Sequence, residues 1–321
     1  MARATAKDKS PMETPEGLRR GLAWLRAMPG SAAPLVEPHP QPDLKRAVLI
    51  MLAGIALFSV LNGVVKDQAQ RFPVNQITFF RNAFALPPLL LILLAGGKIH
   101  RLRMRQPMRH LTHAATMTLS LMLAYLGFRL LPLAETTAIS FIRPLIVTAL
   151  AAPLLGERVT WISWLAVLLG FAGVIIVVQP GAGEIIAIGA LCSLAGAFIG
   201  ALNTLQQRAL SLTDHTIGIA VWYMAISSAM LLPTLFHSWV TPGLFDLLGL
   251  IGMGVASGLC TYLVMRPLAY AGAAALAPVQ YTGLLWSIVI GYLWFGDVPG
   301  TAVLLGSAVV IAATLLVLRR R

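Results

Sequence analysis

Two arginines lie inside long apolar stretches of this sequence, and their chemistry most needs an explanation. Arg81 follows two phenylalanines, and Arg143 interrupts the stretch from Leu131 to Trp161. A guanidinium costs at least ~2.5 kcal/mol at the centre of a spanning helix, so it normally faces a protein interior or a watery cavity. There it can hold a carboxylate or phosphate through two parallel hydrogen bonds. We therefore predict that both arginines bind an anionic group; contact with helix-end carbonyls or with the membrane interface is the simpler alternative for each.

A proline lies next to an interior arginine in the first half of the chain, and another lies close to polar residues in the second half. Pro144 directly follows Arg143, and a proline within a helix removes a backbone donor and kinks the helix. Pro278 stands at a roughly corresponding place in the second half of the chain. Both prolines are predicted hinges, with a bent packing surface as the alternative for Pro144.

Aromatic and amide side chains late in the chain suggest a stacking surface for an organic body. They are Trp222, Gln280, Tyr281 and Trp286. Rings with polar tips offer both an apolar face and a hydrogen bond. One half of a binding site is thus predicted to supply charge and the other half stacking.

Asn62 and Lys66 are four residues apart, which places them on one face of the first apolar helix, near its outer end. They are further candidates for substrate binding, although Lys66 is also explained as an interfacial anchor. Glu135, at the start of a span, is the acid considered for proton coupling, with a favourable helix-dipole contact as the alternative. The remaining acids considered, at span starts or in short connections, are Glu157, Glu184, Asp246 and Asp297.

Histidines and cysteines add no further chemistry to the sequence-based interpretation. No histidine in the spans is expected to have a carboxylate partner, and the two cysteines lie in predicted spans. We expect neither a disulfide nor a metal site, and no cofactor. The absence of protease, hydrolase and nucleotide-binding motifs argues against a membrane-embedded enzyme and against ATP-driven transport.

Composition shows which elements must position these residues. Of the 321 residues, 58% are hydrophobic and 11% are charged, against roughly 25% charged in a soluble domain. Apolar runs of about 20 residues recur almost end to end, which is typical of an all-α polytopic membrane protein. The predicted spans are ten: 47–65, 75–95, 111–128, 135–155, 161–178, 184–205, 216–236, 244–265, 271–295 and 301–318.

The distribution of Lys and Arg predicts the orientation of these spans. Of the 24 Lys and Arg residues, two are the interior arginines, 19 fall on the side that holds both termini, and three fall on the other side. The positive-inside rule therefore puts both termini in the cytoplasm. The net charge of +12 follows from this bias, and without a recognition motif it does not indicate nucleic-acid binding. Residues 1–46 are polar and are predicted to form a disordered cytoplasmic tail; a basic amphipathic helix on the membrane surface over Gly17–Met28 is the alternative for part of it.

Ten spans divide into two groups of five, 47–178 and 184–318. An odd number of spans per half means that the second half enters the membrane inverted. The motif after the fourth span, with Gly156 and Glu157, has an echo in Gly296 and Asp297 after the ninth. Two inverted five-helix repeats would place a binding site near the midplane between the halves. Within this packing, Gly254 and Gly258 are expected to allow a close approach between helices.

With these features the chain resembles the EamA family of the drug/metabolite transporter superfamily. The resemblance rests on PLLGER at the end of the fourth span, LWFGDVP after the ninth, and LFSVLNGVVKDQAQRFPVNQITFFRN from Leu57 to Asn82. The last segment is similar to members that move vitamins, S-adenosylmethionine or metallophores. Many such relatives carry an acidic residue where this chain has Asn62.

The resemblance implies a carrier in the bacterial inner membrane. The expected function is a secondary transporter that moves an amino-acid-like or vitamin-like metabolite by alternating access. A membrane-embedded enzyme and an accessory membrane protein are the alternatives. The expected partners are a small-molecule substrate and membrane lipid, with a homodimer left open. The lack of a deep acid favours facilitated diffusion or exchange over proton symport.

Overall fold

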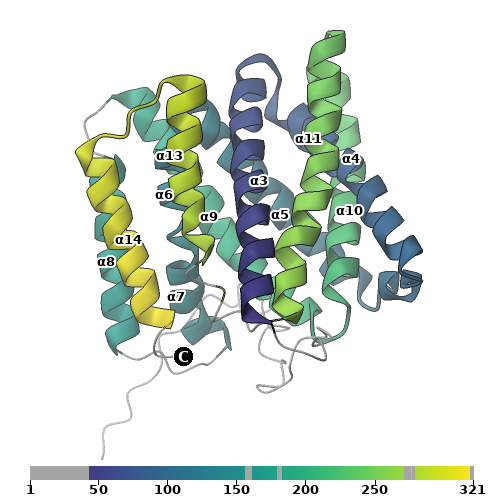
Figure 1. The fold of residues 1–321 in the computed structure, drawn as a ribbon, viewed down its shortest axis with the longest axis horizontal. Helices are drawn as coiled ribbons and strands as arrows, with labels where there is room; N and C mark the ends of the chain where they lie inside the picture. The colour runs from purple at the N-terminus through teal and green to yellow at the C-terminus, as the bar shows by residue number, and fades with distance from the viewer. Residues whose placement is uncertain (1–42, 156–160, 179–182, 271–275, 277–278, 319–321) are drawn as a thin grey trace, which may run out of the picture.

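The computed structural model describes residues 43–155, 161–178, 183–270, 276 and 279–318, and these residues form a bundle of helices (Figure 1). The described part contains no strand. The α-helices are α3 (Leu44–Arg71), α4 (Val74–Ala95), α5 (Pro107–Leu130), α6 (Leu133–Ser140), α7 (Arg143–Leu155), α8 (Trp161–Val178), α9 (Glu184–Leu210), α10 (Thr216–Ser238), α11 (Leu244–Met265), α13 (Thr282–Phe295) and α14 (Thr301–Leu318). Two 3-10 helices, η1 (Ile99–Leu102) and η2 (Arg266–Ala269), lie in connections. The predicted tail, residues 1–46, falls almost wholly outside the described residues.

Seven helical segments among the described residues are long and apolar enough to cross a membrane. They are α3, α4, α5, the α6–α7 segment Leu133–Leu150, α9, α10 and α11. Shorter apolar helices occur at Trp164–Val178, Thr282–Phe295 and Thr301–Leu316. The multi-pass membrane class predicted from the sequence is therefore confirmed, while the count of ten spans and their inversion stay predictions.

Helix ends follow the expected local chemistry. The Asp43 side chain accepts a hydrogen bond from the Arg46 amide (3.0 Å) and caps α3, as short polar side chains commonly do at helix starts. Pro107 opens α5, where its missing donor costs nothing. Gly296 ends α13 in the left-handed conformation, at φ 68°, which glycine adopts without strain.

The fourth apolar segment is broken into α6 and α7 beside the arginine. Helix α6 ends at Ser140, and α7 begins at Arg143. Pro144 has no N–H to donate to the Ser140 carbonyl four residues earlier, and its ring crowds that carbonyl. The structure thus shows a helix break one turn before the proline, while the role of Pro144 as a hinge stays a prediction. Pro278, the other predicted hinge, lies outside the described residues.

Helices from the two halves of the chain pack against each other throughout the bundle. Helix α5 packs on α9, α8 on α14, α4 on both α10 and α11, and α3 on both α11 and α13. A Cβ atom added at Gly254 of α11 would lie 2.6 Å from the Phe80 carbonyl oxygen of α4, so this glycine allows the predicted close contact. The amino-terminal end of α3 and the carboxyl-terminal end of α14 lie on the same side of the bundle, at the bottom of Figure 1.

Candidate functional site

Arg143 is the first residue of α7, and its side chain points toward α9. A Cβ atom added at Gly200 of α9 would lie 2.7 Å from both Cζ and Nε of the guanidinium. The Nε atom is buried, and it has no hydrogen-bond partner among the described residues. Arg143 also forms no ion pair with another described residue. An unpaired buried donor costs about 1–3 kcal/mol, and the Arg143 Nε atom is such a donor among the described residues.

An aromatic contact lies next to this arginine. Phe141, in the break between α6 and α7, meets Tyr281 edge-on, with ring centroids 5.2 Å apart. Tyr281 immediately precedes α13, so the contact joins the two halves of the chain two residues from Arg143. Gln280 is exposed beside Tyr281. Of the predicted stacking residues, Tyr281 is therefore brought near the arginine's segment.

Two other predicted stacking residues, Trp286 and Trp222, lie away from Arg143. Trp286 is 40% exposed on a face of α13 that also exposes Leu285 and Val289, which is the character of a lipid-facing surface. The Trp222 indole N–H donates to the Leu102 carbonyl oxygen (2.7 Å) in the connection between α4 and α5. The Trp222 nitrogen is thus already bound to the protein backbone at the bundle end.

Arg81 lies in a buried polar network in α4. The groups that interact with its charge include Tyr125, Tyr223 and Cys260, none of them a carboxylate. The neighbouring Asn82 accepts from Arg81 Nη1 (3.5 Å) and from the Tyr223 hydroxyl (3.3 Å). Hydroxyl and amide groups thus stabilise this cation, and no acid neutralises it within the described chain. Arg81 interacts with residues of α4, α5, α10 and α11, whereas the Arg143 guanidinium lies against Gly200 of α9.

The Asn82 hydrogen-bond network is a feature of this region that the sequence analysis did not predict. Asn82 is fully buried and donates to the Ser227 hydroxyl (2.8 Å), which also accepts from Thr118 (2.6 Å). These three residues come from α4, α10 and α5. The network therefore ties three helices together at the level of Arg81. A polar residue directly after an interior arginine was the available signal.

Lys66 forms an ion pair with an acid at the end of the bundle opposite to Trp222 and Leu102. Its Nζ lies 2.5 Å from Asp297 Oδ2 and over the Phe295 ring, 4.6 Å from the centroid. Its side chain is 11% exposed. Asn62 is half-buried one turn before Lys66. Lys66 thus forms an ion pair between α3 and the connection from α13 to α14, and its role as an interfacial anchor or as a substrate ligand stays a prediction.

Glu135 shares the surroundings of this ion pair. It lies within electrostatic reach of both Asp297 and Lys66. Glu135 and Asp297 together line a cavity of about 290 Å³ that also includes Ser287 and Pro132. Two acids therefore stand near one lysine at this end of the bundle, and Asp297 holds the direct contact.

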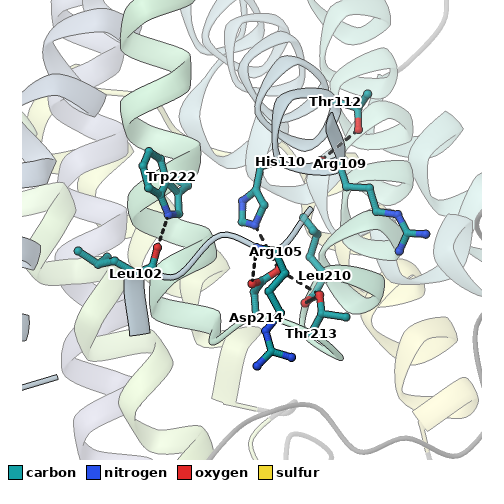
Figure 2. Close-up of polar contacts among 9 residues, drawn as sticks. All are labelled: Leu102, Arg105, Arg109, His110, Thr112, Leu210, Thr213, Asp214 and Trp222. Atoms are coloured by element: carbon teal, nitrogen blue, oxygen red, sulfur yellow. Dashed lines mark hydrogen bonds and ion pairs between the residues drawn. The ribbon is translucent and has the colours of Figure 1, made fainter. Parts of the chain in front are cut away.

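A histidine just before the third predicted span meets a carboxylate, a contact that the sequence analysis did not predict. His110, in the first turn of α5, lies 3.4 Å from Asp214 in the connection between α9 and α10 (Figure 2). Both side chains are almost completely buried. Asp214 Oδ1 also accepts from the Arg105 amide (3.1 Å). The two residues are 104 positions apart, so no local pattern could have linked them.

The comparisons with known proteins agree with the membrane-carrier architecture. A pseudopaline exporter of Pseudomonas aeruginosa is 25% identical over 87% of this chain and 98% of that protein. An S-adenosylmethionine uptake transporter of Rickettsia bellii is 26% identical over 76% and 83% of the two chains. A riboflavin transporter of Rhizobium johnstonii is 28% identical over 88% and 93%. A solved structure of 20% identity, with a TM-score of 0.59 over 85% of this chain and 97% of that chain, shares the fold.

The family comparison covers both halves. The model of the EamA-like transporter family matches residues 45–179 and again residues 187–319. These relatives are transporters and not enzymes, in agreement with the missing catalytic motifs. Together, the two matches span most of the sequence, and the chain belongs to the EamA-like transporter family.

Proposed function

We propose that this protein is a secondary transporter that moves a small organic metabolite with an anionic group across the bacterial inner membrane by alternating access. The observation that carries the proposal is the Arg143 guanidinium, with its buried, unbonded Nε against Gly200. A cation without a counter-charge in a membrane protein is costly unless a ligand or water neutralises it part of the time. A carboxylate or phosphate of the substrate supplies that partner.

The packing pattern supports two inverted five-helix repeats, about 47–178 and 184–318. If α3 corresponds to α9, α4 to α10, α5 to α11, α6–α7 to α13 and α8 to α14, the most extensive contacts between the two halves each have a counterpart. The α5–α9 contact corresponds to α11–α3, and α4–α11 corresponds to α10–α5. The α8–α14 and α4–α10 contacts map onto themselves. Such a pattern is expected when a pseudo-twofold axis relates two halves that rock about a central site.

The second half of the site follows from the same correspondence. The segment before α13 corresponds to the break before α7, so Gln280 and Tyr281 face the substrate from the opposite half. Phe141 and Tyr281 already meet edge-on at this place. An aromatic pair next to a guanidinium suits a ligand with an anionic group and a flat or apolar body. An amino-acid-like or vitamin-like metabolite has this chemistry.

The names of the relatives support a small organic substrate and give no common direction of transport. Their names give pseudopaline export, S-adenosylmethionine uptake and riboflavin transport. These substrates are small organic molecules moved in different directions. The proposal for this chain accordingly concerns the anionic group and its site, which serve either direction equally.

Transport by the purified protein in proteoliposomes tests the proposal. A thermal-shift screen of amino acids, vitamins and nucleosides identifies a substrate, and flux is then compared in Arg143→Gln and Arg143→Lys. We expect Arg143→Gln to weaken binding about 10- to 100-fold, the loss of a charge-assisted contact, and Arg143→Lys to retain part of the affinity. Arg129→Gln, which removes an exposed arginine outside the bundle interior, is the matched control. Unchanged flux in membrane-inserted Arg143→Gln would refute the role of this arginine.

We also propose facilitated diffusion or exchange in place of tight proton symport. Glu135 is the acid with the required position, and it stands beside an ion pair that already contains an acid. With an imposed pH gradient, we expect no accumulation of substrate above its external concentration. Accumulation that collapses with a protonophore and disappears in Glu135→Gln would identify Glu135 as a proton relay and overturn this part of the proposal.

A further inference from the structure

The connection between α4 and α5 concentrates positive charge at one end of the bundle. Residues 98–109, hereafter the basic loop, contain Lys98, Arg101, Arg103, Arg105 and Arg109. The sequence has no aspartate or glutamate from residue 68 to residue 134. Both flanking helices are candidate membrane spans, so the basic loop lies where a bilayer places its headgroups.

The backbone of the basic loop is held by the second half of the chain. Trp222 of α10 donates to the Leu102 carbonyl, and Asp214 accepts from the Arg105 amide (Figure 2). Gly218 of α10 approaches the Arg101 carbonyl so closely that a Cβ atom there would collide with it. The loop is therefore pre-organised, and binding to it costs less ordering entropy than binding to a flexible segment.

Asp214, the acid near the basic loop, already has hydrogen-bond partners of its own. Cations of the loop therefore stay exposed. Asp214 is 3% exposed, and its two oxygens accept from the Arg105 amide and lie near His110 and Thr213. The Arg105 guanidinium points away from this cluster in Figure 2. The side chains of Lys98, Arg103 and Arg105 are exposed, and none forms an ion pair within the described chain.

Apolar side chains are interleaved with these cations. Ile99 is 56% exposed and Met108 is 70% exposed. Cations alone would suit any polyanion, but cations mixed with exposed apolar groups suit a surface that presents anionic headgroups above acyl chains. A nucleic acid or a free anion provides no acyl chain for the apolar side chains of Ile99 and Met108 to contact.

We propose that the basic loop is a binding surface for anionic phospholipid headgroups of the membrane in which the protein resides. Lys98, Arg103 and Arg105 contact the phosphates, and Ile99 and Met108 insert at the acyl boundary. Because Asp214 and Trp222 join the loop to the second half of the chain, a lipid bound there contacts a segment that bridges both halves. Anionic lipid is therefore expected to stabilise the folded protein more than zwitterionic lipid does.

Lipid titration of the full-length protein tests this inference. Purified protein in uncharged detergent is titrated with short-chain phosphatidylglycerol or, separately, with short-chain phosphatidylcholine, and the rise in Tm gives an apparent Kd for each. We expect preferential binding of phosphatidylglycerol that weakens as salt is added. The triple variant K98Q/R103Q/R105Q is expected to lose about 100-fold in phosphatidylglycerol affinity, from ~1 kcal/mol for each basic residue near an anionic surface.

Two further variants make the result specific. K45Q/R46Q/R129Q removes three other exposed basic residues, and it should bind phosphatidylglycerol as the unmodified protein does. K98R/R103K/R105K keeps the charges and should also keep the affinity. The inference is wrong if the Gln triple variant binds phosphatidylglycerol normally, if the control triple variant loses as much affinity, or if the unmodified protein does not distinguish the two lipids.

Discussion

Gly200→Ala adds one methyl group to α9 where the Arg143 guanidinium approaches the helix most closely. The new Cβ atom would lie 2.7 Å from Cζ and Nε and 2.8 Å from Nη2. Ordinary contacts between such atoms are ~3.5–4.0 Å, so the guanidinium must move by about 1 Å. A displaced guanidinium keeps its charge but would lose one of the two hydrogen bonds that we propose it makes to a substrate carboxylate. The expected cost in binding is ~1.5–3 kcal/mol, which is about 10- to 150-fold in affinity.

The substitution is not expected to unfold the protein. Alanine is favoured over glycine within a helix by up to ~1 kcal/mol, and the atoms that must yield are at the end of a flexible side chain. The loss should therefore appear in substrate affinity, with Tm at least as high as in the unmodified protein. This separation distinguishes a positioning role of Gly200 from a general packing role.

The assay is substrate affinity by thermal shift, combined with flux in proteoliposomes. Gly252→Ala is the matched control, because no atom lies within 4 Å of a Cβ at that position of α11. In an Arg143→Lys background, Gly200→Ala should have little further effect, since the two residues act through one contact. Unaltered affinity in Gly200→Ala, or an equal loss in Gly252→Ala, would refute the reasoning.

Three other predictions concern the ends of the bundle. Lys66→Met and Asp297→Asn should each lower the free energy of unfolding by about 1–3 kcal/mol, and the double variant should cost less than the sum of the two; additive losses would show that the ion pair does not couple. Asp214→Ala leaves the amide and imidazole that it contacts without an acceptor, and it should lower stability by about 1–3 kcal/mol; an unchanged Tm would contradict this. In a background without the native cysteines, Lys98→Cys should react with an impermeant thiol reagent only from the cytoplasm and Thr241→Cys only from outside; the reverse result would invert the proposed topology.

The sequence by itself determined the class of protein and the location of its unusual charges. Apolar runs of membrane length are a local property, and burying their backbone polar groups in a bilayer leaves helices as the solution for such runs. The break beside Arg143 was also local, because Pro144 cannot bond to Ser140. The two interior arginines were recognisable for the same reason, since their neighbours along the chain are apolar.

The tertiary structure decided which groups meet. Lys66 and Asp297 are 231 positions apart, and Gly200 faces Arg143 from another half of the chain. The contact between His110 and Asp214 was likewise not predicted. Each of these contacts depends on how helices from both halves pack, and helix packing is set by complementary surfaces. The periodicity of one segment shows which face of that helix is apolar. An ion pair between two segments depends on where both helices lie, and only the packed bundle determines their positions.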